Sequence, residues 1–336
     1  MNLEEYKGVF VFVQQVDSSI TGVSFELIGK AKELAKDLAT DVTAVLLGDK
    51  IKELVDELAF FGADRVIVID DPALKEYTTE PYTHAMDCVI REFKPEVVLY
   101  GATSIGRDLA PRVSARVKTG LTADCTKLEV DAETKNLRMT RPAFGGNLMA
   151  TILCPEHRPQ MATVRPGVMQ KARRNPEAKA EVIEFKPVFE KNNKYVEVLE
   201  VIKKESNKID IQDAKILVSG GRGVGSKENF ELLADLAEAI KGTVSSSRAS
   251  VDANWVEKDR QVGQTGKTVR PDVYFAIGIS GAIQHLAGMQ ESDYIIAINK
   301  DETAPIFDVA DYGVVGDLNK ILPILTEQIN AAKTAK

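Results

Sequence analysis

The stretch Ser245–Gly288 decides how the second half of this chain folds, and it reads SSSRASVDANWVEKDRQVGQTGKTVRPDVYFAIGISGAIQHLAG. Its apolar run Val273–Ile277 has the pattern of a buried strand, and the loops around that run are rich in glycine and hydroxyl side chains. Loops with so many hydrogen-bond donors beside a buried strand suit a ligand that carries phosphate groups. We therefore expect an α/β domain with a nucleotide-type binding site.

The phosphate site is expected directly after that strand, in the run Gly278–Gly288 (GISGAIQHLAG). A strand that ends in Gly-x-Ser-Gly and passes into a helix points free N–H groups and the positive end of the helix dipole at one spot. The small side chains there let a pyrophosphate approach the backbone. The nucleophile elbow of hydrolases, Gly-x-Ser-x-Gly, does not fit, because Gly281 follows Ser280 at once.

Two other glycine-rich runs resemble nucleotide motifs less well. Gly263–Thr268 (GQTGKT) ends like a P-loop, but the first glycine of that motif would fall at Gln261, and the run leads into a strand instead of a helix. Gly220–Gly225 (GGRGVG) lies between a predicted strand and a predicted helix, and its glycines are one residue short of the dinucleotide spacing. Its plain interpretation is a tight turn, whereas Arg222 favours an anion site.

Single polar residues each have an ordinary and a functional interpretation. His285 is either a packed histidine or a hydrogen-bonding partner of a cofactor carbonyl, since His84 and His157 complete neither a metal site nor a Ser-His-Asp set. Arg248 is either half of a surface salt bridge or, among its serine neighbours, a site residue. Thr265 by itself is typical of a turn. The ends of predicted strands, where open α/β sheets bind ligands, hold Asn299, Lys300, Asp301 and Asp317.

The first half of the chain alternates short apolar runs with longer amphipathic ones. This pattern predicts a mainly parallel sheet with helices on both faces. The expected strands are Val9–Val13, Val42–Leu47, Val66–Ile69 and Val97–Tyr100. The expected helices are Ser24–Leu38, Lys50–Phe61, Tyr82–Phe93 and one through the RDLAPRVSARV run.

Shorter runs follow and predict a β-extension added to the parallel sheet, with a turn at Gly145–Gly146. Its expected strands are Leu128–Val130, Leu137–Arg141, Leu148–Leu153 and Gln160–Val164. A charged segment from Lys186 to about Lys208 separates the two halves, and its run Val196–Ile202 (VEVLEVI) has the composition of a strand.

A second alternation of strands and helices completes the chain. Besides Val273–Ile277, its expected elements are the strands Ile216–Val218, Tyr294–Ile298 and Tyr312–Val315 and the helices Asn229–Ile240, about Ala282 onward and Leu318–Ala331. We expect an α/β protein with a nucleotide-binding-like N-terminal α/β domain over residues 1–190. A linker over 191–210 would lead to a C-terminal doubly wound parallel-sheet domain over 211–336.

Composition excludes several classes of function. With 336 residues, 44% of them hydrophobic, the chain supplies two ordinary cores. A net charge of -7 and a pI near 5.3 argue against a nucleic-acid or membrane-surface partner. The acidic N-terminus is unlike a targeting peptide, and no apolar run is long enough to cross a bilayer. The scattered cysteines Cys88, Cys125 and Cys154 fit a reducing cytoplasm and no zinc site.

Several runs together closely resemble the C-terminal half of the electron-transfer flavoprotein alpha subunit, in order and spacing, over Lys215–Leu325. They are VSGGRGVGSKENFELL, SRASVDA, QVGQTGKTVRPDVYFAIGISGAIQHLAGM, AINKD followed by API, and ADYGVVGDL. In the first half, YKGVFVFVQQ and VTAVLLG are similar to the same family more loosely. The resemblance implies a non-covalent FAD in the second domain and a beta subunit as obligate partner, on which the N-terminal domain packs.

The resemblance also implies roles for single residues. Arg248 would lie against the isoalloxazine ring, Thr265 near N5, and His285 near the C2 carbonyl. Ser280–Ala282 would meet the pyrophosphate, and Asn299 and Asp317 would hold the adenosine end. The whole implied set is Arg222, Gly223, Ser247, Arg248, Gln261, Val262, Gly263, Gln264, Thr265, Gly266, Gly278, Ser280, Gly281, Ala282, Gln284, His285, Asn299, Asp317 and Leu318.

The implied function is electron transfer through FAD, between NADH or acyl-CoA dehydrogenases and other redox proteins. A cation and donors beside N1 and C2 of a flavin stabilise its reduced forms, so they raise its potential. No catalytic residue and no metal is implied. Some family members bifurcate electrons from NADH to an acyl-CoA dehydrogenase and to ferredoxin or flavodoxin, when the beta subunit holds a second FAD. The alternatives are an NAD(P)-dependent oxidoreductase built on Gly221–Gly225 and a non-redox nucleotide-binding protein.

Overall fold

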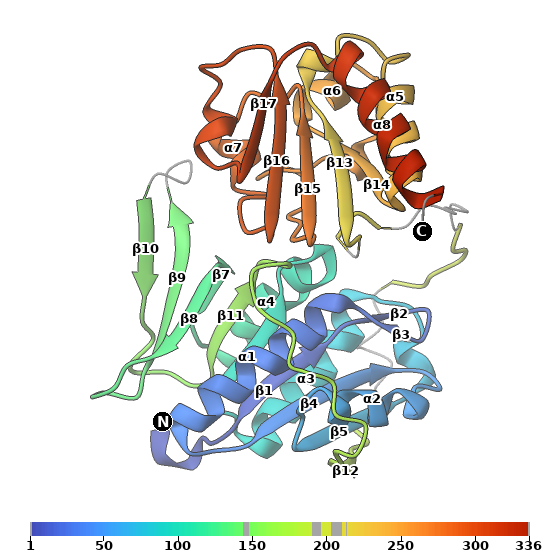
Figure 1. Cartoon of the computed structure of the whole chain (residues 1–336). Coiled ribbons are helices and arrows are strands. Elements are labelled where there is room, and N and C mark those ends of the chain that lie inside the picture. The colour runs from blue at the N-terminus through green and yellow to red at the C-terminus, as the bar shows by residue number, and fades with distance from the viewer. Residues whose placement is uncertain (1, 144–147, 190–195, 203–209, 213, 335–336) are drawn as a thin grey trace. The chain divides into compact units, whose positions relative to one another are not determined.

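The computed structural model describes residues 2–143, 148–189, 196–202, 210–212 and 214–334, which fall into two compact units, Met1–Lys203 and Lys204–Lys336. Figure 1 labels their helices and strands. The predicted Gly145–Gly146 turn and most of the predicted linker, 191–195 and 203–209, lie outside the described residues. The strand predicted at Val196–Ile202 is wrong, because this stretch is irregular and exposes its apolar side chains.

The first unit is built on a seven-stranded parallel sheet in the order β12-β5-β4-β1-β6-β11-β7. Its strands are β1 (Val9–Val13), β4 (Val42–Gly48), β5 (Arg65–Asp70), β6 (Val97–Gly101), β7 (Leu121–Cys125), β11 (Gln160–Val164) and β12 (Glu181–Glu184). The first four confirm the predicted strands of this half, and both faces are covered, as their continuous apolar runs require.

Helices cover both faces of this sheet because successive side chains of a strand point to opposite sides. In β1, Val9, Val11 and Val13 face the core of α1 (Gly22–Leu38) and α2 (Val55–Phe60). Phe10 and Phe12 face the core of α3 (Thr79–Phe93) and α4 (Ser104–Val117). The predicted helix Lys50–Phe61 is shorter than expected, since its first turn is a 3-10 helix over Lys52–Leu54.

The predicted β-extension is confirmed in part. Strands β8 (Lys127–Val130), β9 (Leu137–Ala143) and β10 (Leu148–Ile152) form a separate antiparallel sheet. A two-stranded hairpin, β2 (Gln15–Val16) with β3 (Ser19–Ile20), follows β1. The prediction is wrong for Gln160–Val164, which is β11 and lies inside the parallel sheet between β6 and β7. All five of its residues are buried, as that central position demands.

The second unit is a five-stranded parallel sheet in the order β14-β13-β15-β16-β17. Its elements are β13 (Ile216–Gly220), α5 (Phe230–Ile240), β14 (Thr243–Ser246), α6 (Arg248–Asp252), β15 (Val273–Ile277), α7 (Ile283–Leu286), β16 (Tyr294–Asn299), β17 (Tyr312–Val315) and α8 (Leu318–Thr334). Strand β14 was not predicted, because its sequence TVSS carries too few apolar residues to read as a buried strand.

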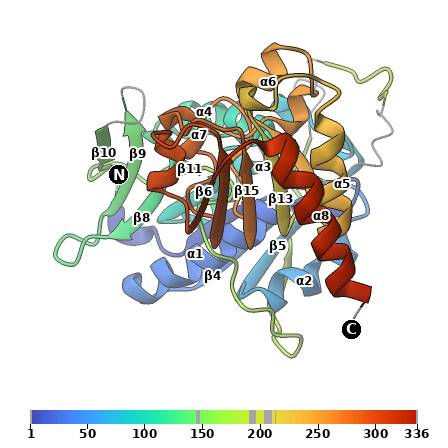
Figure 2. The same cartoon turned by 45° about the horizontal axis from the view of Figure 1, so that its top comes forward.

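The two faces of this second sheet are covered differently. Helices α5 and α8 lie side by side and pack on one face, as Figures 1 and 2 show. The other face is covered mainly by irregular chain around Val262, Val269 and Ile279 and by the 3-10 helix Pro305–Asp308. Within the described residues of both units, no helix is long and apolar enough to span a bilayer.

Candidate functional site

The second sheet has a point at which the direction of strand addition reverses. From β13 the chain adds β14 on one side and then β15, β16 and β17 on the other, so the carboxyl ends of β13 and β15 adjoin at this point. Open parallel sheets bind ligands in the crevice outside such a switch point. The turns that leave these two strands, Gly221–Gly225 and Gly278–Ala282, are the glycine-rich runs that the sequence singled out.

The two turns touch each other through their backbones. The Gly223 N–H donates to the Gly278 carbonyl at 3.0 Å, and the Gly221 N–H donates to the Ile277 carbonyl at 2.8 Å. A Cβ on Gly221 would stand 2.3 Å from the Gly278 carbonyl oxygen, so no larger residue fits. Gly278 has φ +60° and Gly281 has φ +90°, a region that L side chains rarely adopt. Glycine is therefore required here by contact and by conformation.

This pair of turns leaves backbone donors without protein partners. Among the described residues, the amides of Ile279, Ser280, Gly281 and Ala282 donate no hydrogen bond, and neither does the amide of Arg222. Consecutive free amides on an irregular turn form a concave anion site. The predicted helix after Ala282 is only four residues long, so the expected help from a helix dipole is small and the turn amides carry the argument.

A loop, Gln261–Lys267, closes over the same end of the sheet. The Val262 N–H donates to the Ser246 carbonyl at the end of β14, at 2.8 Å, and the Gln264 N–H donates to the Gln284 carbonyl in α7, at 2.7 Å. Gly263 lies directly against α7, since a Cβ there would meet the Gln284 carbonyl oxygen at 2.9 Å. The loop is therefore fixed to the end of β14 and to α7, the helix that follows β15. No helix follows the loop itself, as a P-loop would require.

His285 is buried within this arrangement, with 7% of its surface exposed. Its Nε2 atom lies 2.9 Å from the hydroxyl of Tyr274 on β15. Burial lowers the pKa of His285 from its ordinary value of 6.5 to about 4, and a backbone contact from Val262 only partly offsets that effect. The imidazole is consequently uncharged at neutral pH.

The other two residues expected at the flavin ring are exposed. Arg248 is the first residue of α6, and its side chain is 67% exposed, with Nε 3.3 Å from the Asp252 carboxylate. This pairing is weak at a surface and leaves the guanidinium free to turn toward a ligand. Thr265 stands at the exposed tip of the loop, where its hydroxyl accepts a hydrogen bond from the Gln261 side chain at 3.0 Å.

The two residues expected at the adenosine end also follow strand ends. The side chain of Asn299, the last residue of β16, donates to the Ile279 carbonyl at 2.9 Å and so braces the Gly278–Ala282 turn. Asp317, after β17, accepts from the backbone N–H of Asn319 at 3.0 Å in the first turn of α8. The cofactor-binding residues expected from the sequence thus lie at the carboxyl ends of the five strands or in the segments that follow them.

Three residues of this site were missed by sequence reasoning. Tyr274 reads as one apolar residue of a buried strand, and Ser219 and Ser245 fall outside the predicted strands, yet all three are fully buried. The hydroxyls of both serines make no hydrogen bond of good geometry among the described residues. Only knowledge of strand register, which pairs Ser219 with Ser245 and with Ala276, would have placed them beside Tyr274.

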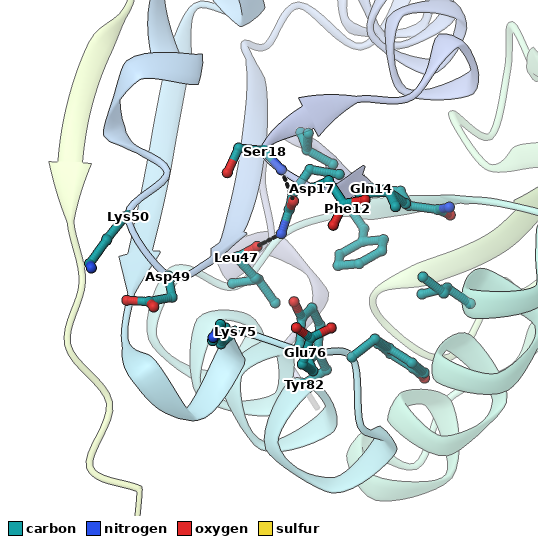
Figure 3. Close-up of a pocket in the computed structure, with 15 residues that line it drawn as sticks. Phe12, Gln14, Asp17, Ser18, Leu47, Asp49, Lys50, Lys75, Glu76 and Tyr82 are labelled. Atoms are coloured by element: carbon teal, nitrogen blue, oxygen red, sulfur yellow. Dashed lines mark hydrogen bonds between the residues drawn. The ribbon is translucent and has the colours of Figure 1, made fainter. Parts of the chain in front are cut away.

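The first unit holds a cavity of about 390 Å³ at the carboxyl ends of β1 and β4 (Figure 3). No glycine turn follows β1; instead the Gln15 side chain reaches across to the Leu47 carbonyl at 3.4 Å. Charges of both signs line the cavity, from Lys50 and Lys75 and from Asp17, Asp49 and Glu76. The cavity therefore lacks the positive bias of a phosphate site.

Comparison with known proteins agrees with this division of the chain. Residues 9–189 match the family model described as "Electron transfer flavoprotein domain", and residues 210–290 match "Electron transfer flavoprotein FAD-binding domain". The chain is 53% identical to "Electron transfer flavoprotein subunit alpha" of Clostridium acetobutylicum, over 99% of both chains.

Two further relatives have more specific names. "Acryloyl-CoA reductase electron transfer subunit beta" of Anaerotignum propionicum is 46% identical, over 99% of this chain and 98% of its own. "Lactate dehydrogenase (NAD(+),ferredoxin) subunit LctC" of Acetobacterium woodii is 45% identical, over 98% of this chain and 79% of its own.

We predict that Gly221→Ala weakens FAD binding, because its Cβ would collide with the backbone of the facing turn and push the two turns apart. Such overpacking costs about 1–3 kcal/mol, which corresponds to binding weakened by about 5- to 150-fold. Bound FAD is counted after gel filtration. Gly242→Ala is the control, since Gly242 precedes β14 at the other end of the sheet and its nearest neighbours stand at 3.1 Å. Full FAD occupancy in Gly221→Ala would contradict the assignment.

We predict that His285 makes the full chain, stripped of flavin, less stable as the pH falls from 6.5 to about 4. In this range the imidazole of His285 is protonated in the unfolded chain but not in the folded chain. The free energy of unfolding therefore drops by at most about 1.4 kcal/mol for each pH unit. Below about pH 4 both states are protonated and this contribution stays constant. Urea unfolding of the wild type and of His285→Gln measures the difference; equal pH slopes for both proteins would refute the buried neutral imidazole.

Proposed function

The chain belongs to the electron-transfer flavoprotein alpha-subunit family, and on that premise we propose that it carries electrons through its FAD between an acyl-CoA dehydrogenase and a second redox protein. The FAD-binding domain is the C-terminal one. The observation that carries the proposal is the pair of crossed glycine turns, whose free amides face the crevice at the switch point of that domain. Their free N–H groups and lack of side chains fit the pyrophosphate of a dinucleotide.

The residues around the turns supply the rest of a flavin site in this proposal. Bound FAD supplies the electron storage, and the chain supplies binding and electrostatics. Ser280, Gly281 and Ala282 hold the pyrophosphate, while Asn299 and Asp317 hold the adenosine end. Arg248 brings a positive charge to the isoalloxazine, Thr265 a hydroxyl, and His285 an uncharged imidazole. The remaining members of the predicted set, from Arg222 to Leu318, form the rest of the binding site at the carboxyl end of the sheet.

Membership in this family implies an electron-transfer flavoprotein beta subunit as partner. We propose that residues 1–190 pack on that subunit and that residues 211–336 form the FAD-binding domain, joined by the linker 191–210. Strand β10 supports a contact surface in the first of these, because it exposes Leu148 by 59%, Met149 by 56% and Ile152 by 38%. Exposed apolar side chains gathered on one edge strand mark an interaction site.

The redox partners follow from chemistry named for the relatives. One relative serves an acryloyl-CoA reductase, and another is part of a lactate dehydrogenase that uses NAD⁺ and ferredoxin. We propose an acyl-CoA dehydrogenase as one partner and bifurcation from NADH, with ferredoxin or flavodoxin as the second acceptor, when the beta subunit holds its own FAD. We place the protein in the cytoplasm, since its three cysteines are free thiols.

The proposal is tested on the purified complex with its beta subunit. We expect the visible spectrum of oxidised flavin, bleached by an acyl-CoA substrate with its dehydrogenase and restored by the second redox protein. NADH oxidation that requires ferredoxin would establish bifurcation. A colourless protein that binds NADH would favour the oxidoreductase alternative, and one that binds AMP or ATP without a redox cofactor would favour the nucleotide-binding alternative.

The same complex tests the role of Arg248. Arg248→Ala should lower the potential at which the flavin takes its first electron by about 60 mV or more, equivalent to a tenfold change in equilibrium constant, because a positive charge beside the reduced ring is lost. Arg270→Ala, which removes a guanidinium before β15 at the opposite end of the sheet, is the matched control. Identical potentials in the two variants would argue against the role given to Arg248.

A further inference from the structure

Tyr274 is the second residue of β15 and has no solvent exposure. Its hydroxyl stands 2.9 Å from Nε2 of His285, eleven residues later in the chain. The two ring centroids are 6.2 Å apart with an angle of 57° between the planes, so the rings meet through the hydrogen bond and are not stacked. A residue of strand β15 thus holds the ring of a residue in α7.

Both groups in this hydrogen bond are neutral. Burial raises the pKa of Tyr274 well above its usual range and lowers the pKa of His285 to about 4. A single proton therefore lies between them, donated either by the Tyr274 hydroxyl to Nε2 or by an Nε2–H group to the Tyr274 oxygen. A neutral imidazole carries one N–H proton. If the Tyr274 hydroxyl donates, that proton is on Nδ1, and if the imidazole donates, it is on Nε2.

Two buried serines favour donation by the tyrosine. Ser219 on β13 and Ser245 on β14 are fully buried, and their hydroxyls lack a well-formed hydrogen bond among the described residues. Both nevertheless act on the Tyr274 hydroxyl closely enough to oppose the rise of its pKa. Hydroxyls that donate to the tyrosine oxygen leave the O–H of Tyr274 to donate to Nε2, so the imidazole proton belongs on Nδ1. Nδ1 is itself buried without a well-formed hydrogen bond among the described residues, and the backbone of Val262 is the group that interacts with the imidazole there.

The orientation of His285 also bears on the loop that carries Thr265. A Cβ on Gly263 would stand 3.5 Å from the Cα of His285, and the backbone of Val262 contacts the imidazole. The next residue, Gln264, is tied to α7 by its hydrogen bond to the Gln284 carbonyl. The loop therefore packs directly on α7, and the imidazole of His285 lies in that contact.

We propose that Tyr274 is a positioning residue of the flavin site, whose hydroxyl holds His285 in one ring orientation and in the tautomer protonated on Nδ1. Tyr274 acts through His285 and is not expected to contact the cofactor. The proposal rests on the proposed function insofar as His285 serves the flavin, whereas the tautomer itself is a property of this chain. The two parts can therefore fail separately.

The test uses the FAD-loaded complex with ¹⁵N-histidine in this chain only. The chain has three histidines, and His285→Gln identifies the signals of His285 by their loss. We expect nitrogen shifts of a neutral ring with an unprotonated, hydrogen-bonded Nε2. In Tyr274→Phe the ratio of the two tautomers should change by about fivefold or more, since one hydrogen bond of ordinary strength is lost. Tyr100→Phe is the control, because Tyr100 is equally buried and its hydroxyl has no hydrogen-bond partner among the described residues.

Two results would overturn the proposal. The first is a His285 signal in the wild-type complex that shows the proton on Nε2. This measurement needs no variant, so the test can be made even if Tyr274→Phe folds poorly. The second is a set of unchanged His285 signals in a folded Tyr274→Phe. The flavin potential of each variant is measured beside the spectra. Altered nitrogen shifts with an unaltered potential would support the positioning by Tyr274 and refute the part of the proposed function that gives His285 a role in setting the potential.

Discussion

The second unit depends on one backbone contact, the crossing of two glycine turns at the point where the strand order reverses. The Gly223 N–H bonds to the Gly278 carbonyl, and Gly221 packs so closely on the same carbonyl that even a methyl group is excluded. This contact is possible only because β13 and β15 are adjacent and parallel, so that their carboxyl ends meet. It brings two stretches of bare backbone together and leaves the amides of residues 279–282 without protein partners.

The other features of the site follow from this crossing. The Gln261–Lys267 loop is fixed to the end of β14 and to α7, which places Thr265 and His285 on neighbouring elements. The face of the sheet below them is covered by irregular segments. Four polar residues are buried there: Ser219, Ser245, Tyr274 and His285. Burying polar groups is costly unless they are paired, which explains why the tyrosine hydroxyl and the imidazole meet. The side chains of Arg222 and Arg248, by contrast, reach solvent.

Much of this architecture could be predicted because it is encoded locally. The strands of the first half are visible as apolar runs, and the two turns of the second half are visible as glycines that follow such runs. Pairing order is not encoded locally, so Gln160–Val164 looked like part of the β-extension although it lies between β6 and β7. Strand β14 is too polar to be recognised. The hydrogen bond between Tyr274 and His285 could not be predicted either, because only the tertiary structure brings the two side chains together.

The central claim is that FAD is held by the backbone amides of the two crossed turns. Hydrogen–deuterium exchange of the purified complex, followed by mass spectrometry with and without FAD, measures those amides directly. The account predicts slower exchange on FAD binding for peptides that contain residues 221–224 and 279–283, together with the 261–267 loop. Protection confined to the cavity of the first unit, around residues 14–18 and 47–50, with unchanged exchange in the two turns, would contradict it.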